Sequence, residues 1–85
     1  MPKISEFYGV AIYMYHDEHA PPHFHAKHGG ASAAFTFDGR VLHGRVHPRV
    51  LRLVLEWTRI HLAELELNWS LARKGGQLVQ IPPLE

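Results

Sequence analysis

The chain has 85 residues, among them 9 lysines and arginines, 8 aspartates and glutamates, 8 histidines and no cysteine. This length leaves room for one domain, placed at residues 1–85, and the lack of cysteine excludes disulfides and cysteine-based zinc sites. The formal net charge of +1 excludes a large basic field at neutral pH, and the 46% hydrophobic composition is that of a globular chain rather than a disordered one.

The first half of the chain predicts an antiparallel β-meander of three or four strands. Its segments are rich in β-branched and aromatic residues, and turn-forming dipeptides separate them. Pro21-Pro22 favours extended backbone, whereas Gly29-Gly30 and Asp38-Gly39 are typical of hairpin turns. We expect strands at about 6–15, 23–28, 31–37 and 40–46.

The second half predicts one long helix at about 48–74. Pro48 suits the first helical position, no glycine or proline follows it until Gly75-Gly76, and apolar residues recur at steps of four and three. Such a helix would be about 40 Å long, whereas a compact domain of this size is only about 30 Å across. We therefore expect the helix to bend, break or extend into a partner, which makes a homodimer an expectation of the sequence. A short extended tail at 77–81 follows, and the fold class is α+β with the helix packed on one face of the sheet.

Five of the eight histidines lie between positions 16 and 28, and strand geometry shows which of them can meet. Side chains alternate along a strand, so His23 and His25 share one face while Phe24 points to the other. His19 precedes the proline pair, where the loop can fold it back over these two histidines. The predicted site is therefore the pair His23 and His25, joined by His19 or by a carboxylate of the same loop, Asp17 or Glu18.

These residues allow three kinds of function. Neutral imidazoles bind Zn, Ni or Fe, so His19, His23 and His25, with Asp17 or Glu18 as a further ligand, form a candidate metal site. Without a metal, two histidines can act as general base and acid, with a cation such as Lys27, Arg40 or Arg45 holding a phosphate, as in a small ribonuclease. The third alternative is that the histidines lie on a solvent-exposed strand without catalytic function, in a protein-interaction domain. The sequence does not decide whether the protein is an enzyme.

His61 is a weaker candidate. It follows Trp57 by four residues and precedes Glu64 by three, so these polar groups lie on a mainly apolar helix face. Polar groups in such a place are hydrogen-bonded, exposed or functional. If the helix covers the face of the sheet that carries the histidines, His61 joins the site.

Three segments resemble a bacterial family known as domain of unknown function 4160. The segments are 4–9, 19–26 and the helical residues 51–57 with Asn68-Trp69, and the specific part is the histidine-rich core Glu18–His25. The resemblance covers essentially the whole chain. It implies a small cytosolic protein, and it marks His19, His23 and His25 as the motif histidines.

The resemblance also implies a partner. Members are often encoded beside, or fused to, domain of unknown function 2442, an arrangement typical of toxin–antitoxin pairs. The leading prediction is therefore a toxin–antitoxin-like or regulatory module that acts with a protein partner through its histidines, with RNA as a possible target. The N-terminus lacks the apolar core of a signal peptide, and no apolar run reaches the ~20 residues that span a bilayer. We expect a cytoplasmic protein without a membrane interaction.

Overall fold

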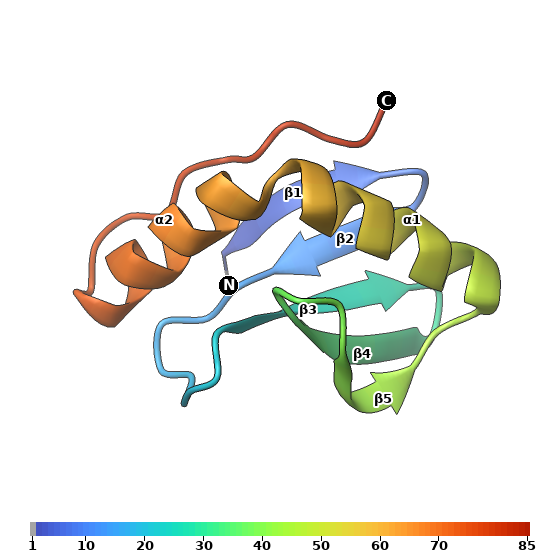
Figure 1. Ribbon diagram of the computed structural model, residues 1–85, viewed down its shortest axis with the longest axis horizontal. Helices are drawn as coiled ribbons and strands as arrows, with labels where there is room; N and C mark the ends of the chain where they lie inside the picture. Colours follow the sequence, from blue (N-terminus) through green and yellow to red (C-terminus); the bar gives the residue numbers. More distant parts are fainter. Residues whose placement is uncertain (1) are drawn as a thin grey trace.

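The computed structural model describes residues 2–85 and has an α+β architecture. Five antiparallel strands form one sheet in the order β1-β2-β3-β4-β5. Two helices follow and pack on one face of that sheet (Figure 1). The strands are β1 Lys3–Phe7, β2 Val10–Tyr13, β3 His23–His28, β4 Ala31–Thr36 and β5 Val41–Arg45, and the helices are α1 Pro48–Ile60 and α2 Leu62–Arg73. The predicted fold class is correct, but the numbers of strands and helices were underestimated.

The fifth strand arises because residues 6–15 form a hairpin rather than one strand. Tyr8 and Gly9 both have positive φ, 51° and 79°, as a two-residue type I′ turn requires. The turn separates β1 from β2, which pair with Phe7 opposite Val10. Only Gly9 signals this turn in the sequence, since tyrosine rarely adopts a positive φ.

The expected single helix breaks at His61, between α1 and α2. His61 has φ −111° and ψ 30°, outside the helical range, although its backbone N–H still donates to the carbonyl of Trp57. One turn earlier, the Thr58 hydroxyl donates to the carbonyl of Val54 at 2.7 Å, a contact that often bends helices. The break fits the expectation that a straight helix would be too long, because the molecule measures 33 Å along its longest axis. Within residues 2–85, neither helix is long and apolar enough to cross a membrane.

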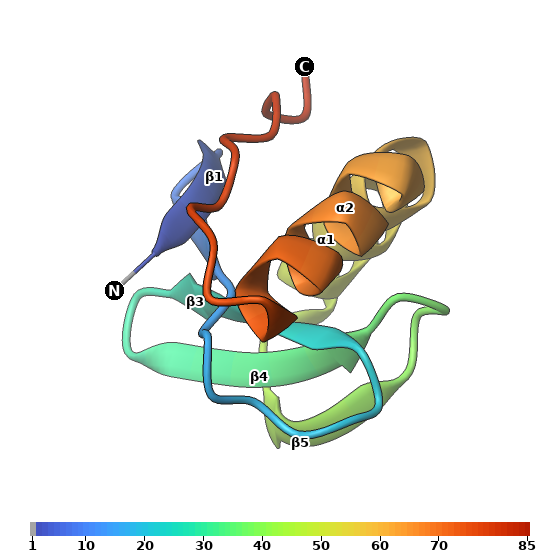
Figure 2. The same ribbon diagram turned by 90° about the vertical axis from the view of Figure 1, so that its left-hand side faces the viewer.

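The core lies between the helices and the concave side of the sheet. Figure 2 shows that the sheet curves around both helices and that its other face carries no helix. Trp57 of α1 is fully buried at the centre, with its ring centroid 5.5 Å from that of Phe7 and 5.7 Å from that of Phe24. Replacing such a residue by alanine typically costs about 3–5 kcal/mol of stability.

The C-terminal tail is extended but is not a strand. Its backbone is held by Asn68 of α2, which is fully buried: the side-chain amide donates to the carbonyl of Val79 and accepts from the N–H of Val79, both at 2.8 Å. The indole N–H of Trp57 donates to the carbonyl of Pro82, and the N–H of Ile81 donates to the carbonyl of Ile4 in β1. Polar residues on the inner face of the helices therefore hold the tail beside the edge of the sheet.

Candidate functional site

The histidine pair lies at the start of β3, on the face that carries no helix. Phe24 points into the core, and the alternation of the strand turns His23 and His25 to the opposite side. Their ring centroids lie 5.3 Å apart. The parity argument therefore places the two rings together, as the structure shows.

Glu18 is the third member of the cluster. The loop between β2 and β3 brings its carboxylate across both rings, where Oε1 lies 2.5 Å from Nε2 of His25 and Oε2 lies 3.4 Å from Nε2 of His23. Within residues 2–85, these three residues are the one group of histidine, aspartate or glutamate side chains whose potential ligand atoms converge. Each atom lies within 4.8 Å of the others. We refer to Glu18, His23 and His25 as the Glu-His-His cluster.

A backbone carbonyl fixes the orientation of His23. Its Nδ1 lies 2.7 Å from the carbonyl oxygen of Pro21, which can only accept, so Nδ1 carries the proton. In a neutral ring, Nε2 then presents its lone pair toward Glu18. Metal-binding histidines are oriented in this way, with the second nitrogen donating to a carbonyl or a carboxylate.

The cluster is partly enclosed but open on one side. The side chain of His23 is 8% exposed, that of His25 19% and that of Glu18 24%. Trp69 of α2 borders His23 at the end of the sheet, with ring centroids 5.6 Å apart. Tyr15 lies against His25 at 4.9 Å, so the open side is lined by aromatic rings.

The electrostatics favour an ionised Glu18. Partial burial by itself raises the pKa of the Glu18 carboxyl, but the hydrogen bond with His25 and the charges of His25 and His23 outweigh burial and hold the pKa below its usual range. The cluster therefore offers an ionised carboxylate beside two histidine rings. This combination is a common donor set for divalent transition metals.

The distances are close to those of a bound ion. Ligand atoms about 2.0–2.1 Å from a tetrahedral zinc ion are about 3.3 Å apart. The 3.4 Å between Glu18 and His23 matches this spacing, and the 2.5 Å hydrogen bond between Glu18 and His25 has to lengthen by roughly 0.8 Å on binding. Donor atoms of the cluster that are as much as 4.8 Å apart have to approach by up to roughly 1.5 Å on binding.

The other predicted residues lie elsewhere. His19 and Asp17 are exposed and do not belong to the cluster, because neighbours in an irregular loop point in different directions and Glu18 takes the inward position. His61 lies at the helix break, where its Nδ1 is 3.1 Å from Glu64 and its ring packs against Trp57. The helices cover the opposite face of the sheet, so His61 does not reach the cluster.

Sequence reasoning did not identify two neighbours of the cluster. His43 of β5 has its ring centroid 6.1 Å from that of His25, because the register places His25 opposite Ala34 and Ala34 opposite His43. Tyr15 follows β2 and keeps the side of Tyr13. The identification of His43 requires the β4–β5 register, which a bulge between Ala34 and Phe35 shifts.

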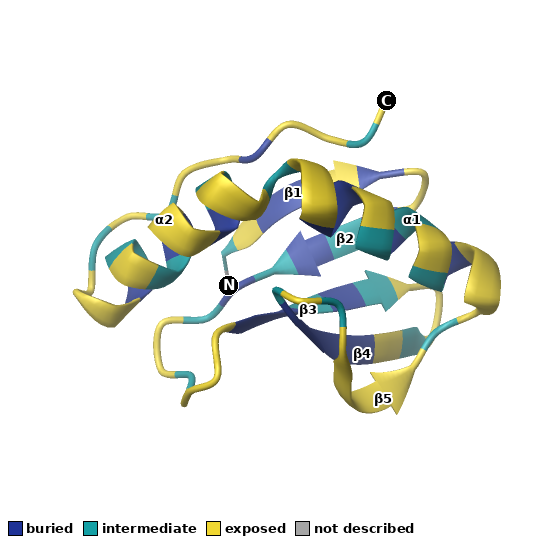
Figure 3. Ribbon diagram, viewed as in Figure 1, coloured by how far each residue is buried: buried dark blue, intermediate teal, exposed yellow. Residues whose placement is uncertain are grey.

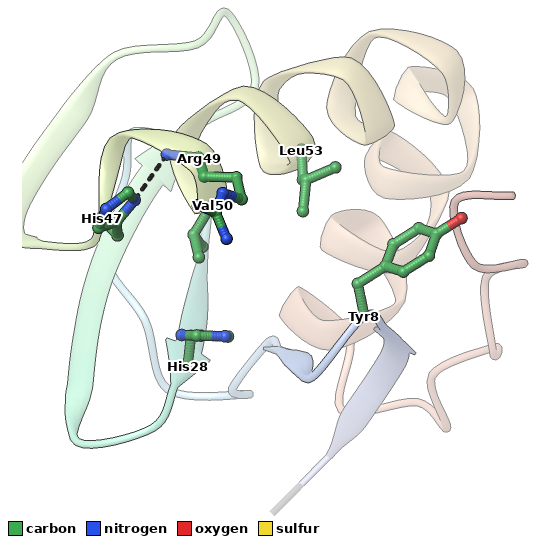
Figure 4. Close-up of a pocket in the computed structure, with 6 residues that line it drawn as sticks. All are labelled: Tyr8, His28, His47, Arg49, Val50 and Leu53. Atoms are coloured by element: carbon green, nitrogen blue, oxygen red, sulfur yellow. Dashed lines mark hydrogen bonds between the residues drawn. The ribbon is translucent and has the colours of Figure 1, made fainter.

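A separate pocket of about 470 Å³ lies between the N-terminus of α1 and the β1–β2 turn (Figure 4). It is lined by the aliphatic residues Val50 and Leu53 and by Tyr8, His28, His47 and Arg49. His47 caps α1 by accepting a hydrogen bond from the N–H of Arg49 at 3.0 Å. His28 is five residues from His23, roughly 16 Å along β3. The pocket therefore does not contribute to the cluster.

Comparison with known proteins supports the family resemblance. No curated protein and no solved structure matches the chain. A family model, described as Domain of unknown function (DUF4160), matches residues 9–70, which include the whole Glu-His-His cluster. The protein partner and the toxin–antitoxin role that the resemblance implies stay predictions. Because the match covers well over half of the 85 residues, the chain belongs to the DUF4160 family.

Proposed function

We propose that the protein binds a divalent transition metal ion, zinc in the first place, through Glu18, His23 and His25. The observation that carries this proposal is that one donor atom from each of the three residues lies within 4.8 Å of the other two. In addition, the backbone carbonyl of Pro21 holds the other ring nitrogen of His23. Three protein ligands leave a fourth position of a tetrahedral ion for water or substrate. Catalytic zinc sites have this composition, whereas structural sites are closed by four protein ligands.

The open position indicates a metal-dependent hydrolytic function. A zinc ion lowers the pKa of its bound water to about 7 and so supplies hydroxide at neutral pH. In this protein, Glu18, His23 and His25 would hold the ion, and the side next to Tyr15 and His43 would admit the substrate. The chain itself supplies orientation and a half-enclosed site.

The geometry favours a metal over metal-free acid–base catalysis. In the structure, Nε2 of His23 and Nε2 of His25 both face the carboxylate of Glu18. A general base needs a ring nitrogen that faces the substrate, and the opposite nitrogen of His23 is already bound to Pro21. A metal ion can be coordinated by Nε2 of His23, Nε2 of His25 and a carboxylate oxygen of Glu18 while all three face one another.

Metal titration of untagged protein tests the proposal. We expect stoichiometric binding of zinc by calorimetry and, with cobalt(II) as a probe, the intense visible absorption of a four-coordinate site. His25→Ala and Glu18→Gln should each weaken binding by 10-fold or more, whereas the matched control His19→Ala should not.

Two results would contradict the metal site. One is the absence of zinc, nickel or iron binding at micromolar concentrations. The other is a loss of affinity in His19→Ala as large as that in His25→Ala. If the metal-free protein instead cleaved RNA and His23→Ala abolished the cleavage, acid–base catalysis would replace the proposed function.

A further inference from the structure

We infer that the sheet face without helices binds single-stranded nucleic acid, and that the strand passes beside the Glu-His-His cluster. The face is continuous from β2 to β5, and residues paired across it share one side: Tyr13, His25 and His43 lie in one row and Lys27 and Arg45 in the next. Neither helix covers this side of the sheet (Figure 2). If a metal ion is bound at the cluster, a phosphate of this strand can contact it, and that contact rests on the proposed function. The binding of nucleic acid to the sheet face does not rest on the proposed function.

The aromatic part of the face suits nucleobases. The rings of Tyr13 and Tyr15 are within 11° of parallel, with centroids 6.2 Å apart, and Tyr15 continues to His25 at 4.9 Å. Both tyrosines are half-buried, so part of each ring is accessible to a ligand. Bases stack on such rings irrespective of their sequence, at about 1–3 kcal/mol per base.

The cationic part suits the phosphates. Lys27 holds its ammonium group 4.8 Å from the centre of the Tyr13 ring, and Arg45 is exposed on β5, two positions across the sheet. Neither cation has a carboxylate partner in the part of the chain that the structure describes. Although the net charge of the whole chain is only +1, Lys27 and Arg45 place two positive charges in one row of this face. Figure 3 shows that β5 is exposed along its length.

The dimensions match a short single strand. From β2 to β5 the face is about 14 Å wide, and four-stranded sheets that bind RNA stack two or three bases over a similar span. A strand that crosses from Tyr13 toward His43 brings a phosphate next to His25. A duplex is excluded from this arrangement, because its bases are already stacked and paired.

An acidic peptide is the alternative occupant. Its carboxylates would also pair with Lys27 and Arg45, but they would not stack on the parallel tyrosine rings as nucleobases do. The rings therefore favour nucleic acid, and the two ligands respond differently to loss of a ring.

The experiment measures fluorescence anisotropy of a labelled 12-nucleotide single-stranded RNA with the full chain, once in EDTA and once with zinc. We expect Tyr13→Ala to weaken binding about 10-fold, and Lys27→Gln and Arg45→Gln each to reduce the slope of log K against log salt by about 0.7. Arg52→Gln is the matched control, because Arg52 is exposed on α1, on the other side of the molecule. Tyr13→Phe keeps the ring and should bind as the wild type, which separates stacking from a folding defect.

The outcomes separate the two proposals. RNA binding in EDTA by a protein that binds no zinc would support this inference and contradict the proposed function. Zinc binding without affinity for single-stranded RNA or DNA would overturn the inference alone. The inference would also be wrong if a glutamate-rich peptide bound more tightly than RNA, if Arg52→Gln lost as much affinity as Arg45→Gln, or if duplex RNA bound as well as single strands.

Discussion

The strongest stability prediction concerns Asn68, whose side chain connects α2 to the C-terminal tail. Asn68→Ala removes two hydrogen bonds to the backbone of Val79, both 2.8 Å long. A hydrogen bond contributes about 1 kcal/mol on average, and polar groups left unpaired inside the protein cost more. Because Asn68 is fully buried, we expect the free energy of unfolding to fall by about 2–3 kcal/mol.

Urea unfolding followed by tryptophan fluorescence measures this loss. For a domain of this size, about 2–3 kcal/mol corresponds to a decrease in Tm of roughly 10–20 °C. Ser70→Ala is the control, because Ser70 is exposed on the same helix and should change stability by less than about 0.5 kcal/mol. The reasoning is refuted if Asn68→Ala unfolds within about 0.5 kcal/mol of the wild type.

Asn68→Asp gives a second measurement on the same contact. The ionised carboxylate can accept from the N–H of Val79 but cannot donate to its carbonyl, so the variant should be destabilised at neutral pH. When protonated, the carboxyl both donates and accepts, as the amide does. Folding therefore favours the protonated form, which raises the pKa of this carboxyl in the folded state, and the difference from the wild type should shrink as pH falls.

Two further predictions concern Gly44 in β5 and Asp38 in the turn between β4 and β5. Gly44→Ala should cost at least about 2 kcal/mol, because Gly44 has φ +85° and a Cβ there would lie 2.4 Å from the carbonyl oxygen of Ser32. Gly30→Ala, where a Cβ meets no atom within 4 Å, should leave the urea midpoint unchanged or raise it. The hydrogen bond from the Thr36 hydroxyl holds the pKa of Asp38 below its ordinary value of 3.8. The stabilisation by Asp38 is therefore complete above that value and is lost as pH falls through the folded pKa, so the Tm advantage of the wild type over Asp38→Asn should disappear in acid; a constant difference would contradict the argument.

The sequence predicts the strands that end in strong turn signals and misses the turn that lacks one. Gly29-Gly30 and Asp38-Gly39 mark their hairpins, and β3 and β4 lie where they were expected. Tyr8 turns with positive φ although its type does not favour it, because Gly9 and the pairing of Phe7 with Val10 determine the hairpin. A break in the helix was expected because a straight helix would be longer than the domain. The position of the break at His61 was not predictable from helix propensity.

The part of the site that lies on β3 was predictable from the alternation of side chains along a strand. His23 and His25 follow from parity, since side chains two apart share a face. The choice between Glu18 and His19 depends on the path of a loop with no regular pattern, so the sequence could only name both. The proximity of His43 depends on the β4–β5 register, which shifts by one residue between the pairs Ala34–His43 and Phe35–Val41 and leaves no local signal in the sequence.

The C-terminal tail has a consequence for self-association. The N–H of Ile81 donates to the carbonyl of Ile4, and the Gln80 side chain donates to the carbonyl of Lys3, so the tail occupies the first two carbonyls of β1. The opposite border, β5, has no neighbouring strand. Unpaired strand borders are where sheets of different molecules join into aggregates, and charged side chains such as Arg45 oppose that growth. The tail therefore protects the start of one border of the sheet, whereas the other border has a charged side chain and an irregular register against the joining of sheets.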